Sequence, residues 1–167
     1  RMDFENDGVF NKIDASFSLT GQSGPNGNGD IDDVDEGRSG MFRSQWYLNE
    51  FTADEAHWVW ATDAGIPELL HNSWGESCVF SAALYYRLYF TITLCNFYLS
   101  QEGNAADQEM RNAEVRFIRA YNYALVMDLY GNAAFTEAVS AEMAVGYTRS
   151  QFFEYVEKEL KECADLM

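Results

Sequence analysis

Apolar and polar positions alternate with helical periodicity along much of the chain, most clearly over residues 106 to 130. One side of this segment carries residues at three- and four-residue steps: Met110, Ala113, Phe117, Ala120, Tyr121, Ala124 and Met127. This spacing predicts an α-helix whose inner face they form. Three of the seven are alanine, and small side chains let a second helix approach closely. Gly131 and Asn132 follow, and both tolerate the left-handed conformation that often ends a helix.

The same periodicity predicts further helices. They cover residues 8 to 20, 39 to 51, 76 to 101 and 149 to 166. The first of them has an open alternative, because its apolar residues from Ile13 to Leu19 also alternate like those of a strand. Antiparallel pairs of such helices are typical of tetratricopeptide-like arrays, so the predicted fold class is all-α, with stacked helix pairs.

Two short patterns predict helix starts. Thr52 with Glu55, and Thr148 with Gln151, have the spacing of a capping box, in which the two residues satisfy each other's backbone N–H groups. Long irregular loops are expected elsewhere. The segment from 21 to 40 is rich in glycine and asparagine, and the segment from 58 to 75 is rich in tryptophan.

The segment from Cys78 to Leu99 is a nearly uninterrupted apolar run of 22 residues. Its length is sufficient to cross a bilayer. However, Arg87 lies near its middle, where insertion would cost about 3 kcal/mol. We therefore predict a fully buried helix, with a membrane-spanning helix as the alternative. Cys78, Cys95 and Cys163 are expected to be buried thiols rather than disulfide partners.

Composition narrows the ligand class. The 167 residues include 27 acidic and 11 basic side chains, which gives a formal net charge of -16. Binding to nucleic acid or to anionic lipid requires an excess of lysine and arginine, so both are excluded as expected partners. Aromatic residues make up 16% of the chain, and tryptophan and tyrosine can stack on sugar rings while their polar edges stay hydrated. A neutral ligand fits this composition best.

Ordered motifs along nearly the whole chain add a family resemblance. The block from Glu114 to Glu137 contains an arginine pair, Arg116 and Arg119, and the Gly131-Asn132 stop. Upstream of it stand Leu19-Thr20-Gly21-Gln22, Gly24-Pro25, Gly29-Asp30-Ile31, Asp35-Glu36-Gly37, Arg43, Asn49-Glu50, Thr52, Asp54-Glu55-Ala56, Trp74 and Leu84-Tyr85-Tyr86-Arg87. In their order and spacing these motifs resemble the SusD/RagB family of outer-membrane glycan-binding lipoproteins. Ala133-Ala134 depart from the pattern, since relatives tend to carry a hydrophobic residue and a proline there.

The resemblance implies a fold, a location and a role. It implies that residues 1 to 167 are the N-terminal portion of one longer SusD-like helical domain. Family members are nutrient-acquisition proteins of Bacteroidota, held at the cell surface on the outer membrane by an N-terminal lipid anchor, which is expected to lie outside these 167 residues. They are not enzymes. They bind an oligosaccharide and deliver it to a TonB-dependent transporter of the SusC type.

The resemblance also implies binding residues. In the starch-binding prototype of the family, an acidic residue, an arginine, a tryptophan and a further polar residue contact the sugar. The matching positions here are Asp35, Arg43, Trp58 and Asp63. Trp58 would offer a flat apolar face to a pyranose, while Arg43 and Asp35 would form a donor and acceptor pair for adjacent hydroxyls.

Neighbouring residues offer alternatives for this site. His57, Trp60 and Trp74 could contact the ligand instead. Trp58 and Trp60 are two residues apart and cannot share a helix face, so one side chain is expected to be buried in the core and the other to face water. Arg43 also has a structural alternative, in which it only ties Asp35 to its own helix.

Other functions remain open. An α-helical glycoside hydrolase could use Asp54 and Asp63 as flanking carboxylates, and a tetratricopeptide-like scaffold would bind only protein. No cofactor is expected. Asn26, Asn28, Asp30 and Asp32 alternate like the start of a calcium loop, but glycine and glutamate are missing from the positions where such a loop needs them, so a structural calcium ion would be non-standard. Arg116 and Arg119 are expected to bridge to carboxylates of neighbouring helices.

Overall fold

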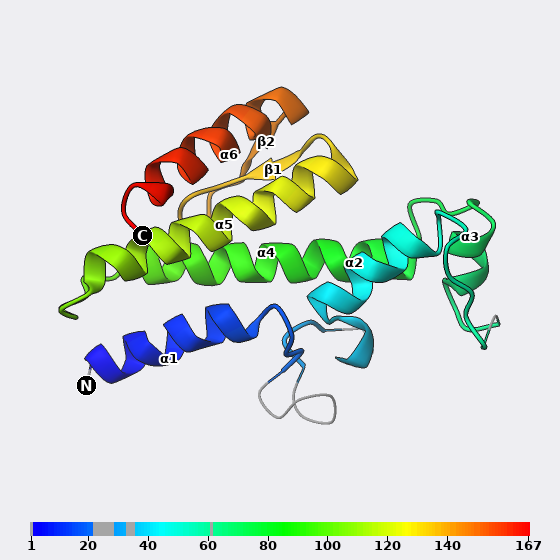
Figure 1. The fold of residues 1–167 in the computed structure, drawn as a ribbon, viewed down its shortest axis with the longest axis horizontal. Helices are drawn as coiled ribbons and strands as arrows, with labels where there is room; N and C mark the ends of the chain where they lie inside the picture. The colour runs from blue at the N-terminus through cyan, green and yellow to red at the C-terminus, as the bar shows by residue number, and fades with distance from the viewer. Residues whose placement is uncertain (1, 22–28, 33–35, 61) are drawn as a thin grey trace. The chain divides into compact units, whose positions relative to one another are not determined.

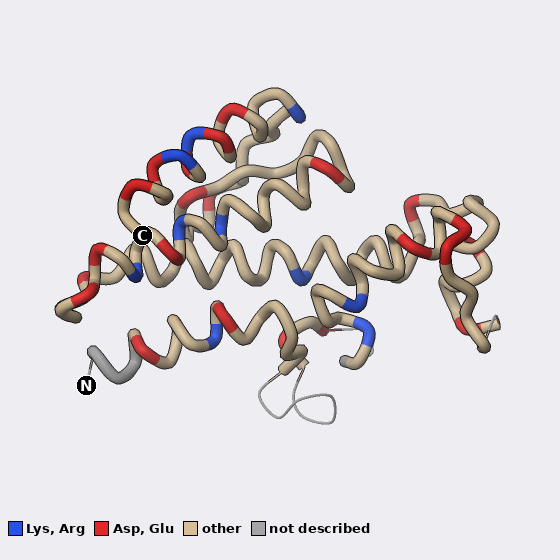
Figure 2. The backbone as a smooth tube through the Cα atoms, in the orientation of Figure 1, with Lys and Arg blue, Asp and Glu red and all other residues tan. Residues whose placement is uncertain are grey.

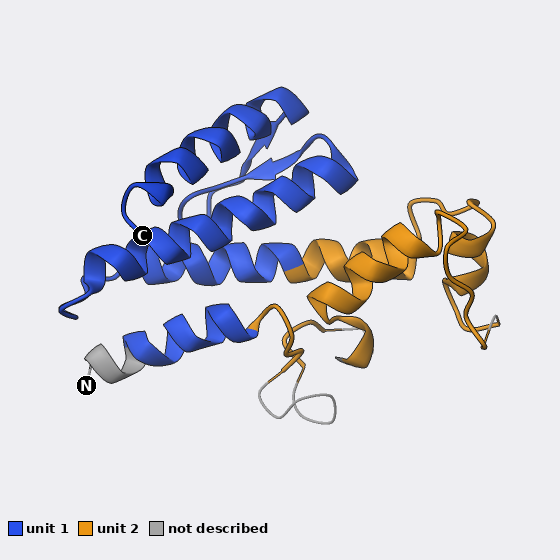
Figure 3. Ribbon diagram, viewed as in Figure 1, with its two compact units in different colours: residues 1–15, 88–167 blue, residues 16–87 orange. Residues whose placement is uncertain are grey.

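The computed structural model describes residues 2–21, 29–32, 36–60 and 62–167. Regular structure is almost entirely helical, which confirms the all-α prediction (Figure 1). The chain divides into two compact units (Figure 3): residues 1–15 with 88–167 form unit 1, and residues 16–87 form unit 2. The placement of residues 1 to 167 within one longer SusD-like domain stays a prediction.

Unit 1 is built around two helices that pack against each other, Gln108–Tyr130 and Arg149–Ala164. Its elements are α1 (Met2–Ala15), the part of α4 (Val79–Leu99) from residue 88 onward, α5 (Gln108–Tyr130), β1 (Ala133–Phe135), β2 (Val145–Tyr147) and α6 (Arg149–Ala164). Helix α6 runs back along α5, and the two strands lie beside this pair (Figure 1). Helices α5 and α6 therefore form a packed pair.

The buried face of α5 differs from the predicted stripe. Ala113 and Ala120 are buried as expected, but Met110 and Phe117 are exposed. The inner face instead centres on Tyr123, whose ring lies 5.0 Å from that of Phe135 and 5.5 Å from that of Phe152. The prediction was wrong by a rotation of the helix, because apolar residues lie around much of α5 and the predicted stripe omitted buried ones such as Val126.

The segment after α5 forms a short β-hairpin that the sequence analysis did not predict. Strands β1 and β2 pair antiparallel, with Ala134 opposite Gly146. The rings of Phe135 and Tyr147 stack at 3.9 Å and 6°. The Tyr123 hydroxyl donates to the carbonyl of Thr136 at 2.7 Å and accepts from its N–H at 3.0 Å. Strands of three residues are too short to leave a periodic signal.

Two arginines of α5 connect it to α6, as predicted. The Arg116 guanidinium donates twice to Glu159, at 3.0 and 2.7 Å. Arg119 reaches the same Glu159 at 3.5 Å, and it also donates to Glu137, after β1, at 2.7 Å and to Asn96 of α4 at 2.9 Å. Burial disfavours the charge of Glu159, but the hydrogen bonds and charges of Arg116 and Arg119 outweigh it, so the pKa of Glu159 lies below its usual value.

Helix α6 begins as predicted. Thr148 is its N-cap, and both hydrogen bonds of the capping box with Gln151 are present. The second predicted box is not formed. The Thr52 hydroxyl donates back to the Leu48 carbonyl at 2.6 Å, and residues 51 to 54 form a turn rather than a helix start. This difference arises because Thr52 follows a helix end, whose free carbonyls compete for its hydroxyl.

Helix α1 also differs from its prediction. It covers Met2–Ala15 instead of residues 8 to 20. The chain turns at residues 16 to 18, and in unit 2 the Phe17 ring stacks against that of Phe42 at 5.8 Å and 27°. The apolar residues from Ile13 to Leu19 therefore belong to two different structures, a helix end and a turn.

Unit 2 contains η2 (Glu36–Arg38), α2 (Met41–Glu50), α3 (Ile66–Leu70) and α4 up to residue 87. Arg87 is fully buried and connects three separate segments of the unit. Its guanidinium donates to the Ser39 carbonyl at 2.7 Å, to the Thr20 carbonyl at 3.1 Å and to the Asp30 carboxylate at 2.8 Å. This explains how an arginine can stand inside the long apolar run.

The described helices include none that is long and apolar enough to cross a membrane. Helix α4 matches the predicted helix of residues 76 to 101 within three residues at each end. All three cysteines are buried thiols, as expected. Burial raises the pKa of the Cys95 thiol to about 12, so this group is not a nucleophile at neutral pH.

Candidate functional site

The candidate site stands on a small aromatic core in unit 2. Buried apolar residues from α2, α3 and the start of α4 form this core: Tyr47, Phe51, Ile66, Leu69, Cys78 and Phe80. Trp58 packs against it from the irregular segment that follows α2. The core therefore gives a fixed base to a stretch of chain that has no regular structure of its own.

Trp58 is half-buried and is held from two sides. Its ring lies 5.5 Å from that of Tyr47 at 64°, an edge-to-face contact. Its indole N–H donates to the Asp63 carboxylate at 3.3 Å. Two of the residues that the family resemblance pointed to, Trp58 and Asp63, thus lie in direct contact.

Trp60 is the exposed tryptophan of the pair. Its exposed fraction is 63%, and its ring lies 5.4 Å from that of Trp58 at 65°. The sequence left open which of the two would face water. In the structure Trp58 packs against the core of unit 2, and Trp60 faces water. A large aromatic ring that remains this exposed on a fixed base is a feature of binding sites.

Arg43 reaches the same cluster from α2. Its Nε donates to the Tyr47 hydroxyl at 2.7 Å, and its guanidinium lies 5.3 Å from the centre of the Tyr47 ring. Its Nη1 donates to the Gly37 carbonyl at 2.7 Å. Arg43 and Trp58 are therefore joined through Tyr47, and we call Tyr47, Trp58 and Trp60 the aromatic cluster.

Tyr47 is the residue that sequence reasoning missed. It is only 4% exposed, yet it contacts both Arg43 and Trp58. A signal was available, since Tyr47 follows Arg43 by four residues on a predicted helix, where side chains lie on the same face. The spacing identified a neighbour but not its role.

The remaining predicted residues are not joined to this group by the contacts of the described part of the chain. Asp35 lies outside the described residues. His57 is exposed and lines a separate pocket of about 490 Å³ with Asp54 and His71. Trp74 is 46% exposed, and among the described residues no hydrogen bond or ring contact links it to Trp58.

The segment that carries the site is acidic. Between Arg43 and Arg87 the chain has no lysine or arginine and six acidic residues: Glu50, Asp54, Glu55, Asp63, Glu68 and Glu76. Figure 2 shows acidic positions on the chain around α3. Negative potential of this kind disfavours an anionic ligand, and Arg43 is the charged donor that faces the cluster.

The residues weighed for calcium are placed only in part. Asn26 and Asn28 lie outside the described residues, and the carboxylate of Asp30 is paired with Arg87 at 2.8 Å. Within the described ranges there is no group of three or more His, Cys, Asp or Glu side chains that could hold a metal ion.

The residues of this arrangement offer three kinds of contact that a sugar can use. Trp60 offers an apolar face, Asp63 accepts hydrogen bonds and Arg43 donates them, and these three roles are what a pyranose with equatorial hydroxyls requires. Asp54 and Asp63, the carboxylates weighed for a hydrolase, belong to different surroundings. Asp54 lines the pocket of His57, whereas Asp63 accepts from Trp58.

Comparison with known proteins identifies the family. No family model matches the chain. It is 38% identical over 161 residues to the starch-binding protein SusD of Bacteroides thetaiotaomicron, a match that covers 95% of this chain. The chain spans 29% of the length of that curated relative. With this similarity over nearly its whole length, the chain belongs to the SusD family.

Proposed function

We propose that this protein is a non-catalytic glycan-binding protein of the cell surface. It holds an oligosaccharide and delivers it to a TonB-dependent transporter of the SusC type in the outer membrane, to which a lipid anchor attaches it. The relative's name supports the glycan, because that protein is called starch-binding. The transporter, the anchor and the surface location follow from the family resemblance.

One observation carries the proposal. Trp60 is exposed over 63% of its surface while its neighbour Trp58 is fixed by Asp63 and by Tyr47. An exposed tryptophan that packs on a second, fixed tryptophan can stack on a sugar ring, while Asp63 and Arg43 of the same unit offer an acceptor and a donor for its hydroxyls. Asp35, His57 and Trp74 remain proposed contacts of the same ligand.

Isothermal titration of the full-length protein against plant, host and microbial oligosaccharides tests this function. We expect binding to at least one glycan, and a loss of affinity in Trp60→Ala. The control is Phe97→Ala, which removes a partly exposed ring of α4 in unit 1 and should leave affinity unchanged. Failure of the full-length protein to bind any glycan of the panel would exclude the proposal.

Two outcomes would assign a different function. Release of shorter sugars from a bound glycan, abolished in Asp54→Asn, would indicate a hydrolase. Co-purification with a transporter without measurable affinity for any sugar would indicate a protein scaffold.

A further inference from the structure

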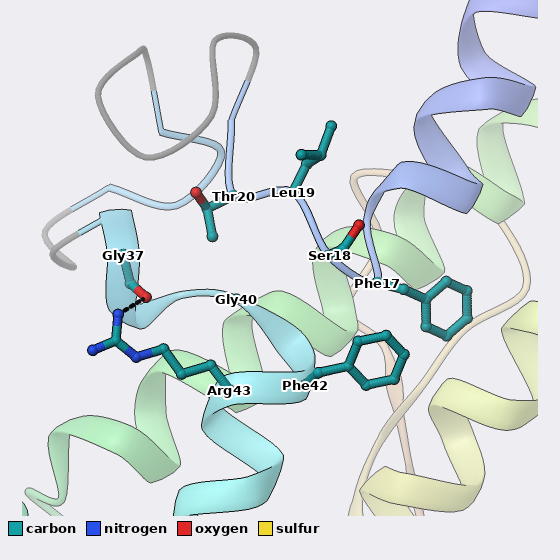
Figure 4. Close-up of a pocket in the computed structure, with 8 residues that line it drawn as sticks. All are labelled: Phe17, Ser18, Leu19, Thr20, Gly37, Gly40, Phe42 and Arg43. Carbon is teal, nitrogen blue, oxygen red and sulfur yellow. Dashed lines mark hydrogen bonds between the residues drawn. The ribbon is translucent and has the colours of Figure 1, made fainter.

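A pocket on the other side of Arg43 is not used by the site described above. It has a volume of about 340 Å³, and we call it the Phe42 pocket. Residues from the turn after α1, from η2 and from the start of α2 line it: Phe17, Ser18, Leu19, Thr20, Gly37, Gly40, Phe42 and Arg43. All of them belong to unit 2. Figure 4 shows the Phe17 and Phe42 rings at one end and Arg43 at the other.

The walls of the Phe42 pocket are apolar and open. Phe42 is 54% exposed and Leu19 is 43% exposed, although both are large hydrophobic residues. Phe42 is supported from behind by the stacked ring of Phe17. Apolar surface that is held in place and faces a hollow favours an apolar group of a ligand.

Arg43 supplies the polar end of the pocket. Its Nε is bonded to Tyr47 and its Nη1 to Gly37, so the side chain is fixed (Figure 4). Within the described part of the chain its Nη2 has no hydrogen-bond partner. The pocket therefore presents one fixed donor opposite an apolar wall, and Arg43 is its only charged lining residue among those described.

The glycine at the base of the pocket keeps it open. A side chain at position 40 would meet the Thr20 methyl at 3.3 Å, which is tighter than ordinary contact. The volume of 340 Å³ is near the lower end of the range of small-molecule sites. This volume is larger than a methyl or acetyl group alone would fill, and it can hold one sugar unit with such a substituent.

We propose that the Phe42 pocket is a subsite for an acylated sugar unit of the glycan, one that carries an acetyl group. The acetyl methyl packs against Phe42 and Leu19, and its carbonyl accepts from Arg43 Nη2. The proposal rests on the glycan-binding function proposed above. Arg43 joins the two sites, because it contacts Tyr47 of the aromatic cluster and also lines the Phe42 pocket.

An acetyl group fits better than the other substituent that an arginine could recognise. A uronic acid would pair its carboxylate with Arg43 but would leave the apolar surface of Phe42 and Leu19 without a partner. It would also enter a unit whose residues from 44 to 86 carry six acidic and no basic side chains. A neutral carbonyl with a methyl group uses both ends of the pocket and meets no such repulsion.

The test compares glycans that share a backbone and differ in acylation. The pairs are acetylated and saponified xylan oligosaccharides, acetylated and saponified glucomannan oligosaccharides, partially acetylated and untreated maltoheptaose, and N-acetylated chitotriose against cellotriose. The last pair separates an N-acetyl source from an O-acetyl ester. In at least one pair we expect the acylated member to bind the full-length protein about tenfold more tightly, the low end of what one apolar group contributes to discrimination.

Two variants locate the effect. Phe42→Ala should remove the preference for the acylated member and leave the affinity for the saponified one unchanged. Its exposed position makes misfolding a small concern, and Leu19→Ser, also exposed, should reduce the preference in the same direction. Trp60→Ala should weaken both members by the same factor and keep their ratio.

Each other outcome overturns the inference. Equal affinity for acylated and saponified members, or a preference that survives in Phe42→Ala, excludes the acyl subsite and leaves the glycan function standing. Tighter binding of oligogalacturonate than of any neutral probe assigns the pocket to a carboxylate. Absence of binding to every glycan removes the proposed function and the subsite together.

Discussion

The α5–α6 pair in unit 1 and the aromatic cluster in unit 2 both combine arginines with aromatic rings, but they use them differently. In the helix pair, the guanidinium groups of Arg116 and Arg119 end on carboxylates of the same unit. The nearby Tyr123 ring is enclosed by other rings. In unit 2, the Nη2 group of Arg43 has no partner among the described residues, and Trp60 keeps most of its surface in water.

This difference distinguishes arginines that stabilise the fold from an arginine that is available to a ligand. An arginine that is paired with carboxylates of its own unit and packed between helices stabilises the fold and presents little to a ligand. An arginine fixed through two donors, with a third unfilled beside exposed rings, is preorganised for an external acceptor. The same residue types therefore predict opposite consequences when they are removed.

The largest expected effect is loss of stability in Arg119→Ala. This change leaves the buried Asn96 side-chain oxygen without its donor and removes one of the two arginines that contact the buried Glu159, which keeps only Arg116. A buried acceptor left without its donor costs about 1–3 kcal/mol of unfolding free energy, and the weaker pairing of the buried Glu159 carboxylate adds to this loss. Chemical denaturation followed by circular dichroism measures it. Lys158→Ala, whose side chain is 69% exposed, is the matched control and should change stability by less than about 0.5 kcal/mol.

The comparison predicts the reverse pattern in unit 2. Trp60→Ala should leave the unfolding free energy nearly unchanged, because the ring is mostly in water. Glycan affinity should fall about 30-fold, the loss expected for an aromatic residue that contributes about 2 kcal/mol to binding. Titration with the glycan that the wild-type protein binds gives this value. A variant that unfolds easily but binds normally would show that Trp60 is structural and would break the comparison.

The sequence predicted the helix pair more fully than the cluster. Helices of many residues repeat their apolar positions several times, so α4, α5 and α6 could be placed within a few residues of their ends. The roles of Arg116 and Arg119 also followed, because arginines on a packed helix need buried acceptors. The rotation of α5 about its axis could not be predicted, since apolar residues lie around much of this helix and the partner elements decide which of them are buried.

The cluster depends on contacts that no local pattern encodes. Trp58 and Trp60 could be named as alternatives, but which one faced water was decided by the hydrogen bond from Trp58 to Asp63. The strands β1 and β2 and the end of α1 were missed for a related reason. Each is short and is set by ring stacking between residues distant in sequence, such as Phe17 with Phe42.

A smaller stability effect is expected at the start of α6. Thr148→Ala removes the side-chain acceptor of the capping box, so the Gln151 N–H loses its partner. The expected loss is about 1 kcal/mol of unfolding free energy. Thr148→Ser keeps the hydroxyl and should retain most of the stability. Equal losses in both variants would mean that the methyl group, rather than the cap, stabilises the helix.

The smallest effect is a pH dependence that belongs to the helix pair alone. The pKa of Glu159 is lowered in the folded protein, because Arg116 and Arg119 favour its charged form more than burial disfavours it. A carboxyl with a lowered folded pKa stabilises the fold above its unfolded value of 4.5, and this contribution is lost as pH falls through the folded pKa. Unfolding free energy should therefore decline below pH 4.5 in the wild type and decline less steeply in Glu159→Gln. Identical slopes in the two proteins would show that other carboxylates cause the loss of stability at low pH. Evidence for the structural role of the arginines in the helix pair would then come from Arg119→Ala alone.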